Sequence, residues 1–207
     1  MSFATFVAGQ LRKPSGLFGR LVVARILNRS NAPMSELTLK LLALAPDDRV
    51  LEVGFGGGDL IDRMARKTTR GRISGADFSP EMTALCARRF AALVRAGRLE
   101  LRCASVDALP YGDGEFTKAC TVNTIYFWPD PSAALGEIRR TLRPGGRLVV
   151  AFNLPATAGK LPYTRYGFTL YEPEQVRALL ESAGFRNGDL VAGSSRLGEF
   201  FCAAGTK

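Results

Sequence analysis

The segment 50–59, VLEVGFGGGD, constrains the fold of this chain more than any other stretch. A short apolar run that contains one glutamate ends abruptly in four glycines, three of them at alternate positions. Short apolar runs ended by glycine are typical of buried strands. Glycine has no Cβ, so another group can come close to its backbone. The segment therefore predicts a strand that turns tightly into a helix, beside something that needs room.

Strand-like and helix-like segments alternate from residue 47 to residue 151. We expect strands at 49–53, 72–77, 99–104, 117–124 and 147–152, and helices at 60–67, 82–96, 132–142 and 173–183. Asp59, Ser79 and Ser132 stand where helix N-caps are expected. The alternation predicts an α/β fold: a Rossmann-like doubly wound sheet, mostly parallel, with helices on both faces. Residues 190–204, with glycines at 193 and 198, predict a C-terminal antiparallel hairpin.

Two helical segments, 18–27 and 35–45, precede the first predicted strand and stand outside this alternation. We therefore expect residues 1–45 to form an N-terminal helical cap over the C-terminal edge of the sheet. Residues 46–207 then make one compact domain, for which the chain is long enough. Apolar and basic residues mix in 12–26, so this part serves either as a lid over a ligand or as a contact with an anionic membrane surface.

Composition excludes several classes of protein. The chain has no histidine, which excludes a Ser-His-Asp hydrolase and a His-ligated zinc enzyme. Its four cysteines are far apart, so we expect reduced thiols and no metal site. The net charge of +9 comes from scattered basic residues without interleaved aromatics, which does not favour a nucleic-acid partner.

The location expected from the sequence is the cytoplasm. No apolar stretch approaches the roughly 20 residues of a transmembrane helix. The first residues lack the charged start, apolar core and cleavage site of a secretory signal.

Three interpretations of the glycine segment compete. The first is a tight turn without a ligand, although one turn seldom needs four glycines. The second is a dinucleotide site, whose pattern has glycine or alanine where this chain has Asp59, and a negative charge there opposes a pyrophosphate. The third is S-adenosylmethionine, which has no phosphate and carries a cationic sulfonium and an ammonium group. Acidic residues suit that ligand.

At this point the sequence resembles the class I S-adenosylmethionine-dependent methyltransferases, over about residues 39–183. It is most similar to the small-molecule branch that includes the ubiquinone and menaquinone biosynthesis enzymes. VLEVGFGGG resembles that family's first motif, GADFSPEM its second, LPYGDGEF its loop before the fourth strand, and LRPGGRLVV its turn into the fifth strand. Each motif alone is weak, but all four occur in order at suitable spacing.

The resemblance implies that S-adenosylmethionine is the cofactor and S-adenosylhomocysteine the product. It places the following cofactor-binding residues: Glu52, Gly54, Phe55 and Gly56 beside the methionine portion, Asp77 on the ribose hydroxyls, Phe78 on adenine, and Ser105, Val106 and Asn123 nearby. Many relatives carry aspartate at the position of Ser105, so this chain departs from the family pattern there. As an alternative role, Asp77 is simply a helix cap.

Methyl transfer is an in-line displacement, so alignment of the reacting groups accounts for much of the catalysis. The resemblance implies that the region after the fourth strand faces the transferred methyl, which makes Asn123 and Tyr126 the candidate catalytic residues. Tyr126, Trp128, Tyr163 and Tyr166 are the candidate substrate-pocket residues, although burial in the core explains aromatics equally well.

We therefore expect a methyltransferase that acts on a small, apolar or aromatic acceptor. Three alternatives stay open: a lipid or quinone methyltransferase at a membrane surface, a nucleic-acid methyltransferase, and a protein that binds S-adenosylmethionine without catalysis. The acidic and glycine residues of the first two motifs do not separate a catalyst from a sensor.

Overall fold

The computed structural model describes Thr5, Ala8, Gly9 and residues 31–207. These residues form a seven-stranded sheet in the order β3-β2-β1-β4-β5-β7-β6. The strands are β1 (Arg49–Val53), β2 (Arg72–Asp77), β3 (Leu99–Cys103), β4 (Phe116–Val122), β5 (Leu142–Asn153), β6 (Arg186–Ser195) and β7 (Gly198–Thr206).

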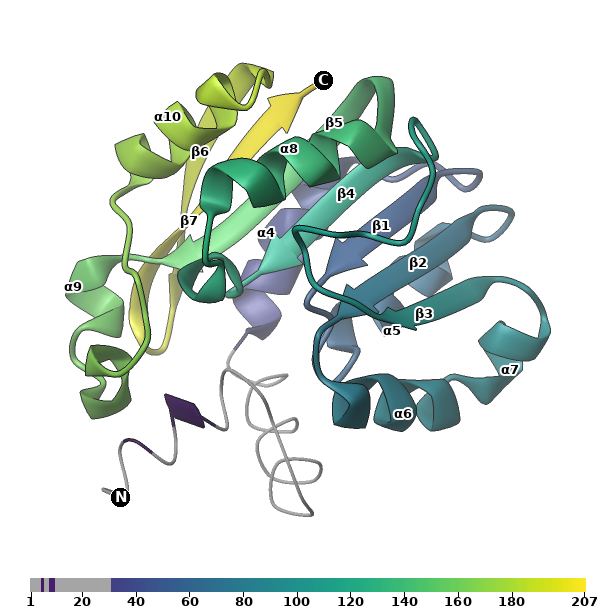
Figure 1. Ribbon diagram of the computed structural model, residues 1–207, viewed down its shortest axis with the longest axis horizontal. Helices are drawn as coiled ribbons and strands as arrows, with labels where there is room; N and C mark the ends of the chain where they lie inside the picture. Colours follow the sequence, from purple (N-terminus) through teal and green to yellow (C-terminus); the bar gives the residue numbers. More distant parts are fainter. Residues whose placement is uncertain (1–4, 6–7, 10–30) are drawn as a thin grey trace.

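The sheet is parallel from β3 to β5, whereas β7 runs antiparallel to both β5 and β6. In Figure 1 the arrowheads of β1, β2 and β4 end at one edge, and β7 points the opposite way. The predicted Rossmann-like sheet with a C-terminal antiparallel hairpin is confirmed. The hairpin is longer than the range 190–204 predicted from the sequence, because β6 already begins at Arg186 and β7 ends only at Thr206.

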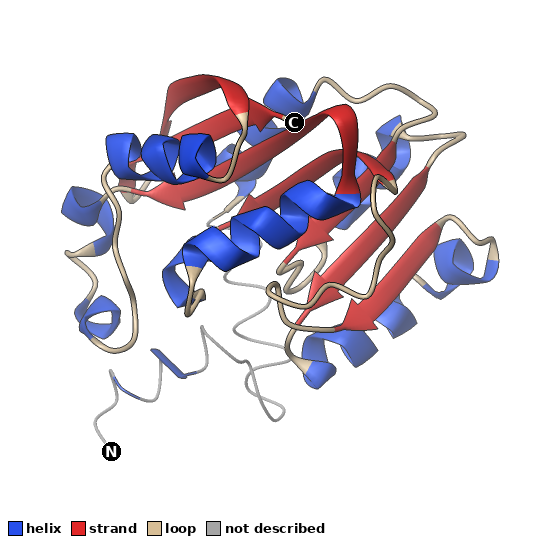
Figure 2. Ribbon diagram, turned by 45° about the horizontal axis from the view of Figure 1, so that its top comes forward, coloured by secondary structure: helices blue, strands red, loops and turns tan. Residues whose placement is uncertain are grey.

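Helices cover both faces of the sheet (Figures 1 and 2). The helical elements are α4 (Ala32–Leu42), α5 (Asp59–Lys67), α6 (Pro80–Arg89), α7 (Ala91–Arg95), η2 (Ile125–Phe127), α8 (Pro131–Thr141), α9 (Pro155–Ala158), η3 (Pro162–Arg165) and α10 (Pro173–Ser182).

Two apolar clusters, one on each face, form the core. One joins strand residues such as Leu51 and Val150 to Leu135 of α8 and Val176 of α10. The other joins the alternate strand residues to α4, α5 and α6. Since both faces are covered, β1 is buried at every position after Arg49, as expected for a central parallel strand.

Helix α4 differs from the prediction made for the helix at 35–45. It lies against β4, β5, β6 and β7 and beside α5, and its Met34 and Leu42 belong to the second apolar cluster. The body of this helix therefore covers a face of the sheet, and only its first turn reaches the C-terminal edge. The predicted helix at 18–27 and the basic amphipathic segment lie outside the described residues, so the cap at 1–45 stays a prediction there.

Three helix starts test the predicted caps. Ser79 caps α6 as predicted, because its Oγ accepts a hydrogen bond from the Met82 N–H at 3.3 Å. Asp59 does not cap α5: Gly58 occupies that position, and Asp59 is the first helical residue. Ser132 does not cap α8 either, because Asp130 accepts from the N–H groups of both Ser132 and Ala133. The predictions for Asp59 and Ser132 were wrong because each helix begins before the first apolar residue of its periodic pattern.

The predicted helix at 82–96 is two helices, α6 and α7, with a break at Phe90. Phe90 leaves helical dihedral angles, with φ −109° and ψ 26°, and it is buried. Its ring packs close to the backbone of Gly58. The tertiary contact therefore interrupts a segment that is helical by local preference.

The cap of α8 gives a direct test of this correction. Asp130→Ala removes the acceptor for two otherwise unpaired N–H groups, so it should lower the free energy of unfolding by about 1 kcal/mol. Ser132→Ala changes an exposed residue inside the helix and should be close to neutral. Urea denaturation of both variants measures this. An equal loss in the two variants would contradict the assignment of Asp130 as the cap.

Candidate cofactor and acceptor site

A cavity of about 280 Å³ lies at the carboxyl ends of the parallel strands. Within the sheet, β2 is the neighbour of β1 on one side and β4 is its neighbour on the other side. Such a reversal of strand order opens a crevice between the loops, where α/β sheets bind their ligands. Gly54 follows β1 and Asn123 follows β4, so the two loops meet at this crevice.

Every predicted site residue except Tyr166 lines this cavity. The predicted residues found there are Glu52, Gly54, Phe55, Gly56, Asp77, Phe78, Ser105, Val106, Asn123, Tyr126, Trp128 and Tyr163. Tyr166 does not line the cavity, and its side chain is 46% exposed. Its place in the acceptor pocket therefore stays a prediction.

The three alternate glycines serve different purposes. All have positive φ angles, which favour glycine. A Cβ on Gly54 would lie 2.3 Å from Thr124 Cγ2, and a Cβ on Gly58 would lie 2.6 Å from Phe90 Cε2. A Cβ on Gly56 would meet no atom of the described residues within 4 Å. Gly54 and Gly58 therefore allow neighbouring loops and helices to pack, while Gly56 leaves its space to a ligand.

Asp77 joins the glycine loop to the start of α6. Its Oδ2 accepts a hydrogen bond from the Gly56 N–H and its Oδ1 accepts one from the Ser79 N–H, each at 2.9 Å. Burial raises the pKa of this carboxyl, and the two backbone hydrogen bonds act in the opposite direction. Each oxygen keeps a further lone pair, so both can also accept from a pair of ligand hydroxyls.

Glu52 is a buried carboxyl group without a full set of partners. It lines the cavity, and its Oε2 has no hydrogen-bond partner among the described residues. Burial raises the pKa of Glu52 to about 8, and the nearby charges of Asp77 and Asp59 act in the same direction. A ligand ammonium group would donate the missing hydrogen bond to this oxygen.

A hydrogen-bond network surrounds Asn123, whose backbone is left-handed with φ 58°. Its Oδ1 accepts from the Tyr126 hydroxyl at 2.9 Å and from Asn153 Nδ2 at 3.0 Å, and its Nδ2 donates to Asn31 Oδ1 at 2.8 Å. The side-chain amide of Asn123 is therefore fixed by η2, by the end of β5 and by the residue before α4.

Asn31 and Asn153 were not predicted as site residues, although both line the cavity. Asn153 had a usable signal, since it is the polar residue that directly follows the apolar run of β5. Asn31 had none, because only the tertiary fold brings the start of α4 to the end of β4.

Aromatic side chains form the other wall of the cavity. Phe168, which the sequence did not single out, lies at its centre, with ring centroids 4.6 Å from Phe127, 5.9 Å from Tyr126 and 6.1 Å from Tyr163. Burial raises the pKa of Tyr126. The Tyr126 hydroxyl therefore keeps its proton near neutral pH and positions Asn123, but it is not available as a general base.

Two further findings bear on ligands. Among residues 31–207 and the few described before them, no group of three or more potential metal ligands occurs. Within the same residues no helix is long and apolar enough to cross a membrane.

Comparisons with known proteins agree with this geometry. Residues 51–150 match a family described as a methyltransferase domain. The uncharacterized methyltransferase YdaC of Bacillus subtilis is 27% identical over 170 residues, which are 82% of this chain and 89% of that protein. The ubiquinone/menaquinone biosynthesis C-methyltransferase UbiE of Geobacter sulfurreducens is 31% identical over an alignment of 176 residues, which covers 72% of this chain and 69% of that one.

The fold has a solved counterpart. The crystal structure of a SAM dependent methyltransferase from Aquifex aeolicus superposes with a TM-score of 0.75 at 20% identity, over 89% of this chain and 96% of that one.

The chain belongs to the class I S-adenosylmethionine-dependent methyltransferases, and S-adenosylmethionine is its cofactor. The described residues fit this ligand. Gly56 leaves open space, Asp77 offers two oxygens, and the orphaned Glu52 oxygen suits a cation. The dinucleotide alternative is not supported, since Asp59 lines the cavity where a pyrophosphate would need positive charge or bare N–H groups.

The glycines provide a matched pair of variants. Gly58→Ala should lower the free energy of unfolding by about 2 kcal/mol or more, because the methyl group meets the Phe90 ring in a strained backbone. Gly56→Ala should cost only about 1 kcal/mol for its positive φ, yet it should weaken binding of S-adenosylhomocysteine more. Denaturation and calorimetric titration measure the two quantities. Loss of stability without loss of affinity in Gly56→Ala would contradict the proposed ligand space.

Glu52 predicts a pH dependence of stability. Its pKa is about 8 when folded, against 4.5 for an ordinary glutamate, so the folded protein binds this proton more tightly than the unfolded chain. The stabilisation is complete below about pH 4.5 and is lost as the pH rises through 8. The melting temperature of the ligand-free protein should therefore fall from pH 6 to pH 8.5.

Glu52→Gln is the control for this prediction, because it keeps the shape and removes the titrating group. Its melting temperature should be nearly constant over the same range, since the chain contains no histidine to titrate there. A slope equal to that of the unaltered protein would assign the effect to another group.

Proposed function

We propose that this methyltransferase transfers the methyl group to a small, neutral, aromatic or otherwise planar apolar acceptor. The carrying observation is the division of the cavity into two unlike halves. Around the glycine loop its described lining includes Glu52, Asp59 and Asp77. Around Tyr126, Phe127, Tyr163 and Phe168 it contains no charged residue among those described.

The uncharged half limits the chemistry of the acceptor. A phosphorylated or carboxylated group buried there would have no cation to pair with among the described residues, and such burial is costly. The aromatic rings instead favour stacking against a planar ring. The amides of Asn123 and Asn153 and the hydroxyl of Tyr126 form the polar end of this half, which suits a carbonyl or hydroxyl group on the acceptor.

The same half offers no general base among the described residues. Tyr126 keeps its proton, and the three carboxyl groups lie on the cofactor side. The acceptor therefore carries a nucleophile that reacts without losing a proton first, or it is an acidic phenol or enol whose ionised oxygen is paired by the positive charge of the cofactor sulfonium. Its electron pair forms a bond to the methyl carbon while the carbon–sulfur bond breaks toward sulfur, which gives S-adenosylhomocysteine. The chain contributes alignment of the two reactants.

The relatives support a quinone-like acceptor as the first class to test. The Geobacter sulfurreducens relative is named a ubiquinone/menaquinone biosynthesis C-methyltransferase, and a reduced quinone is a planar, neutral molecule with acidic hydroxyl groups. The cytoplasmic location stays a prediction, and so does the role of residues 12–26 as a lid or as a contact with a membrane.

Transfer of labelled methyl groups from S-adenosylmethionine to a panel of acceptors tests the proposal. Hydroquinones, naphthoquinols and acidic phenols should accept the label, whereas phosphorylated analogues and RNA should not. A preference for RNA would support the nucleic-acid alternative. A requirement for anionic vesicles with long-tailed quinols would support the membrane alternative. Binding of S-adenosylhomocysteine without transfer to any acceptor would support a protein that does not catalyse.

Two variants separate the halves of the cavity. Phe168→Ala should raise the KM for the acceptor several-fold and leave the affinity for S-adenosylhomocysteine unchanged, since Phe168 is part of the aromatic wall. Asp77→Ala should do the reverse. It should weaken the binding of S-adenosylhomocysteine by roughly 2 to 4 kcal/mol, because two charge-assisted hydrogen bonds are lost. An effect of Phe168→Ala on the cofactor alone would contradict the division into halves.

A further inference from the structure

The loop between β3 and β4 is attached to the body of the protein on both sides of its cavity-lining residues. Ala104, just after β3, donates its N–H to the carbonyl oxygen of Asp77 at 3.0 Å. Leu109 forms the second attachment, which comes from α8. Ser105 and Val106 lie between these two points and line the cofactor side of the cavity.

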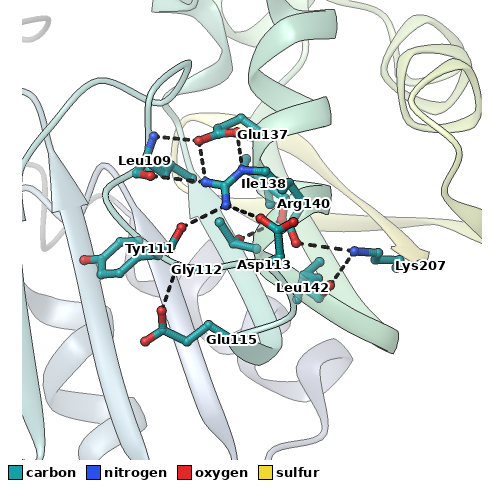
Figure 3. Close-up of polar contacts among 11 residues, drawn as sticks. Leu109, Tyr111, Gly112, Asp113, Glu115, Glu137, Ile138, Arg140, Leu142 and Lys207 are labelled. Carbon is teal, nitrogen blue, oxygen red and sulfur yellow. Dashed lines mark hydrogen bonds and ion pairs between the residues drawn. The ribbon is translucent and has the colours of Figure 1, made fainter.

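Helix α8 holds Leu109 through two of its side chains, as Figure 3 shows. The Leu109 N–H donates to Glu137 Oε1 at 2.9 Å, and the Leu109 carbonyl oxygen accepts from Arg140 Nη2 at 3.2 Å. Both polar groups of one loop residue are therefore paired to one turn of one helix. This leaves the loop little freedom to shift at that point.

The guanidinium of Arg140 uses all of its N–H groups. Besides Leu109, it donates through Nε and Nη2 to both oxygens of Glu137, at 2.8 and 2.7 Å. Through Nη1 it donates to the carbonyl oxygen of Tyr111 at 2.9 Å and to Asp113 Oδ1 at 2.6 Å. A planar fork with five donors can satisfy this set, whereas a lysine ammonium has only three.

The Tyr111 side chain extends this attachment to the sheet. Its hydroxyl donates to the Gly75 carbonyl oxygen at 3.0 Å, and its ring packs edge-to-face on Phe116 at 5.1 Å. Gly75 lies on β2, two residues before Asp77. The loop is thus tied to the same strand that carries the ribose-side carboxylate.

Stability alone does not account well for this arrangement. The side chain of Arg140 is 33% exposed and that of Asp113 is 81% exposed, and exposed ion pairs contribute little to folding stability. The Arg140 guanidinium instead fixes the positions of two carbonyl groups in this loop, those of Leu109 and Tyr111. The described residues of the loop have few other internal hydrogen bonds; one runs from the Ala108 N–H to the Ser105 carbonyl oxygen at 3.3 Å.

We propose that Arg140, which does not line the cavity, is a positioning residue that holds Ser105 and Val106 in place for the adenine end of the cofactor. The inference depends on cofactor binding and is independent of the acceptor. It also explains how a loop that presents a serine and a valine to the cavity can offer a fixed surface to the ring.

Calorimetric titration with S-adenosylhomocysteine tests the proposal in the full chain. Arg140→Met should weaken binding about tenfold, the loss of roughly one net hydrogen bond to the ligand. Arg140→Lys should be intermediate, because lysine keeps the charge and cannot reach both carbonyl groups. The same titrations with S-inosylhomocysteine, where a carbonyl replaces the adenine amino group, test the site of action. The preference for the adenine ligand should shrink in Arg140→Met.

Arg147→Met is the matched control. Arg147 donates to Asp189 Oδ2 at 2.9 Å, its side chain is 23% exposed, and it does not line the cavity. Arg147→Met should lower the melting temperature and leave the affinities for S-adenosylhomocysteine and S-inosylhomocysteine within twofold of those of the unaltered chain. If Arg140→Met fails to fold, Glu137→Gln serves instead, since it keeps the size of the side chain and weakens the support of the same guanidinium.

Two results would overturn the inference. One is an Arg140→Met protein, or the Glu137→Gln protein in its place, that melts at a lower temperature and binds S-adenosylhomocysteine as tightly as the Arg147→Met protein. The other is an equal loss of affinity for both ligands with the preference unchanged. Absence of binding in the unaltered chain would instead overturn the assignment of the cofactor, which keeps the two failures distinguishable.

Discussion

The site depends on the contact between one buried carboxylate and the loop that follows β1. Asp77 receives the N–H of Gly56 on one oxygen and the N–H of Ser79 on the other. A single side chain therefore fixes both the turn of the glycine loop and the start of α6. The hydrogen bond from the Gly54 N–H to the Ala76 carbonyl oxygen, at 2.7 Å, continues the ladder between β1 and β2 up to this point. These hydrogen bonds hold the two loops in a fixed arrangement at the edge of the cavity.

Much of the fold followed from the sequence because local and tertiary preferences agree there. The apolar run 50–53 is buried on both faces, and Asp77 ends a strand just before a serine cap and a proline. The predictions failed where a tertiary contact decides. Phe90 leaves the helix to pack against Gly58, and α4 lies on a face of the sheet because its apolar residues fit the second core cluster.

The site shows the same division. Residues at strand ends, such as Glu52 and Asn123, could be predicted because parallel strands bring their carboxyl ends to one edge. Phe168 and Asn31 could not, since they come from a long connection and from the segment before β1, where no period marks the inward residues. Tyr166 comes from the same connection and is exposed outside the cavity lining, so its predicted place in the pocket has no support from the residues described.

The contact between Gly54 and Thr124 has a consequence for how this enzyme can diversify. The Thr124 methyl group occupies the place that a Cβ on Gly54 would need, so the cofactor loop and the acceptor loop are fitted to each other at one point. Positions farther along the aromatic wall, such as Phe127 and Phe168, have no such tie to the glycine loop. Selection for a new acceptor can therefore change the far wall without disturbing the glycine loop, while a side chain at residue 54 would require both a smaller residue at 124 and a strained backbone.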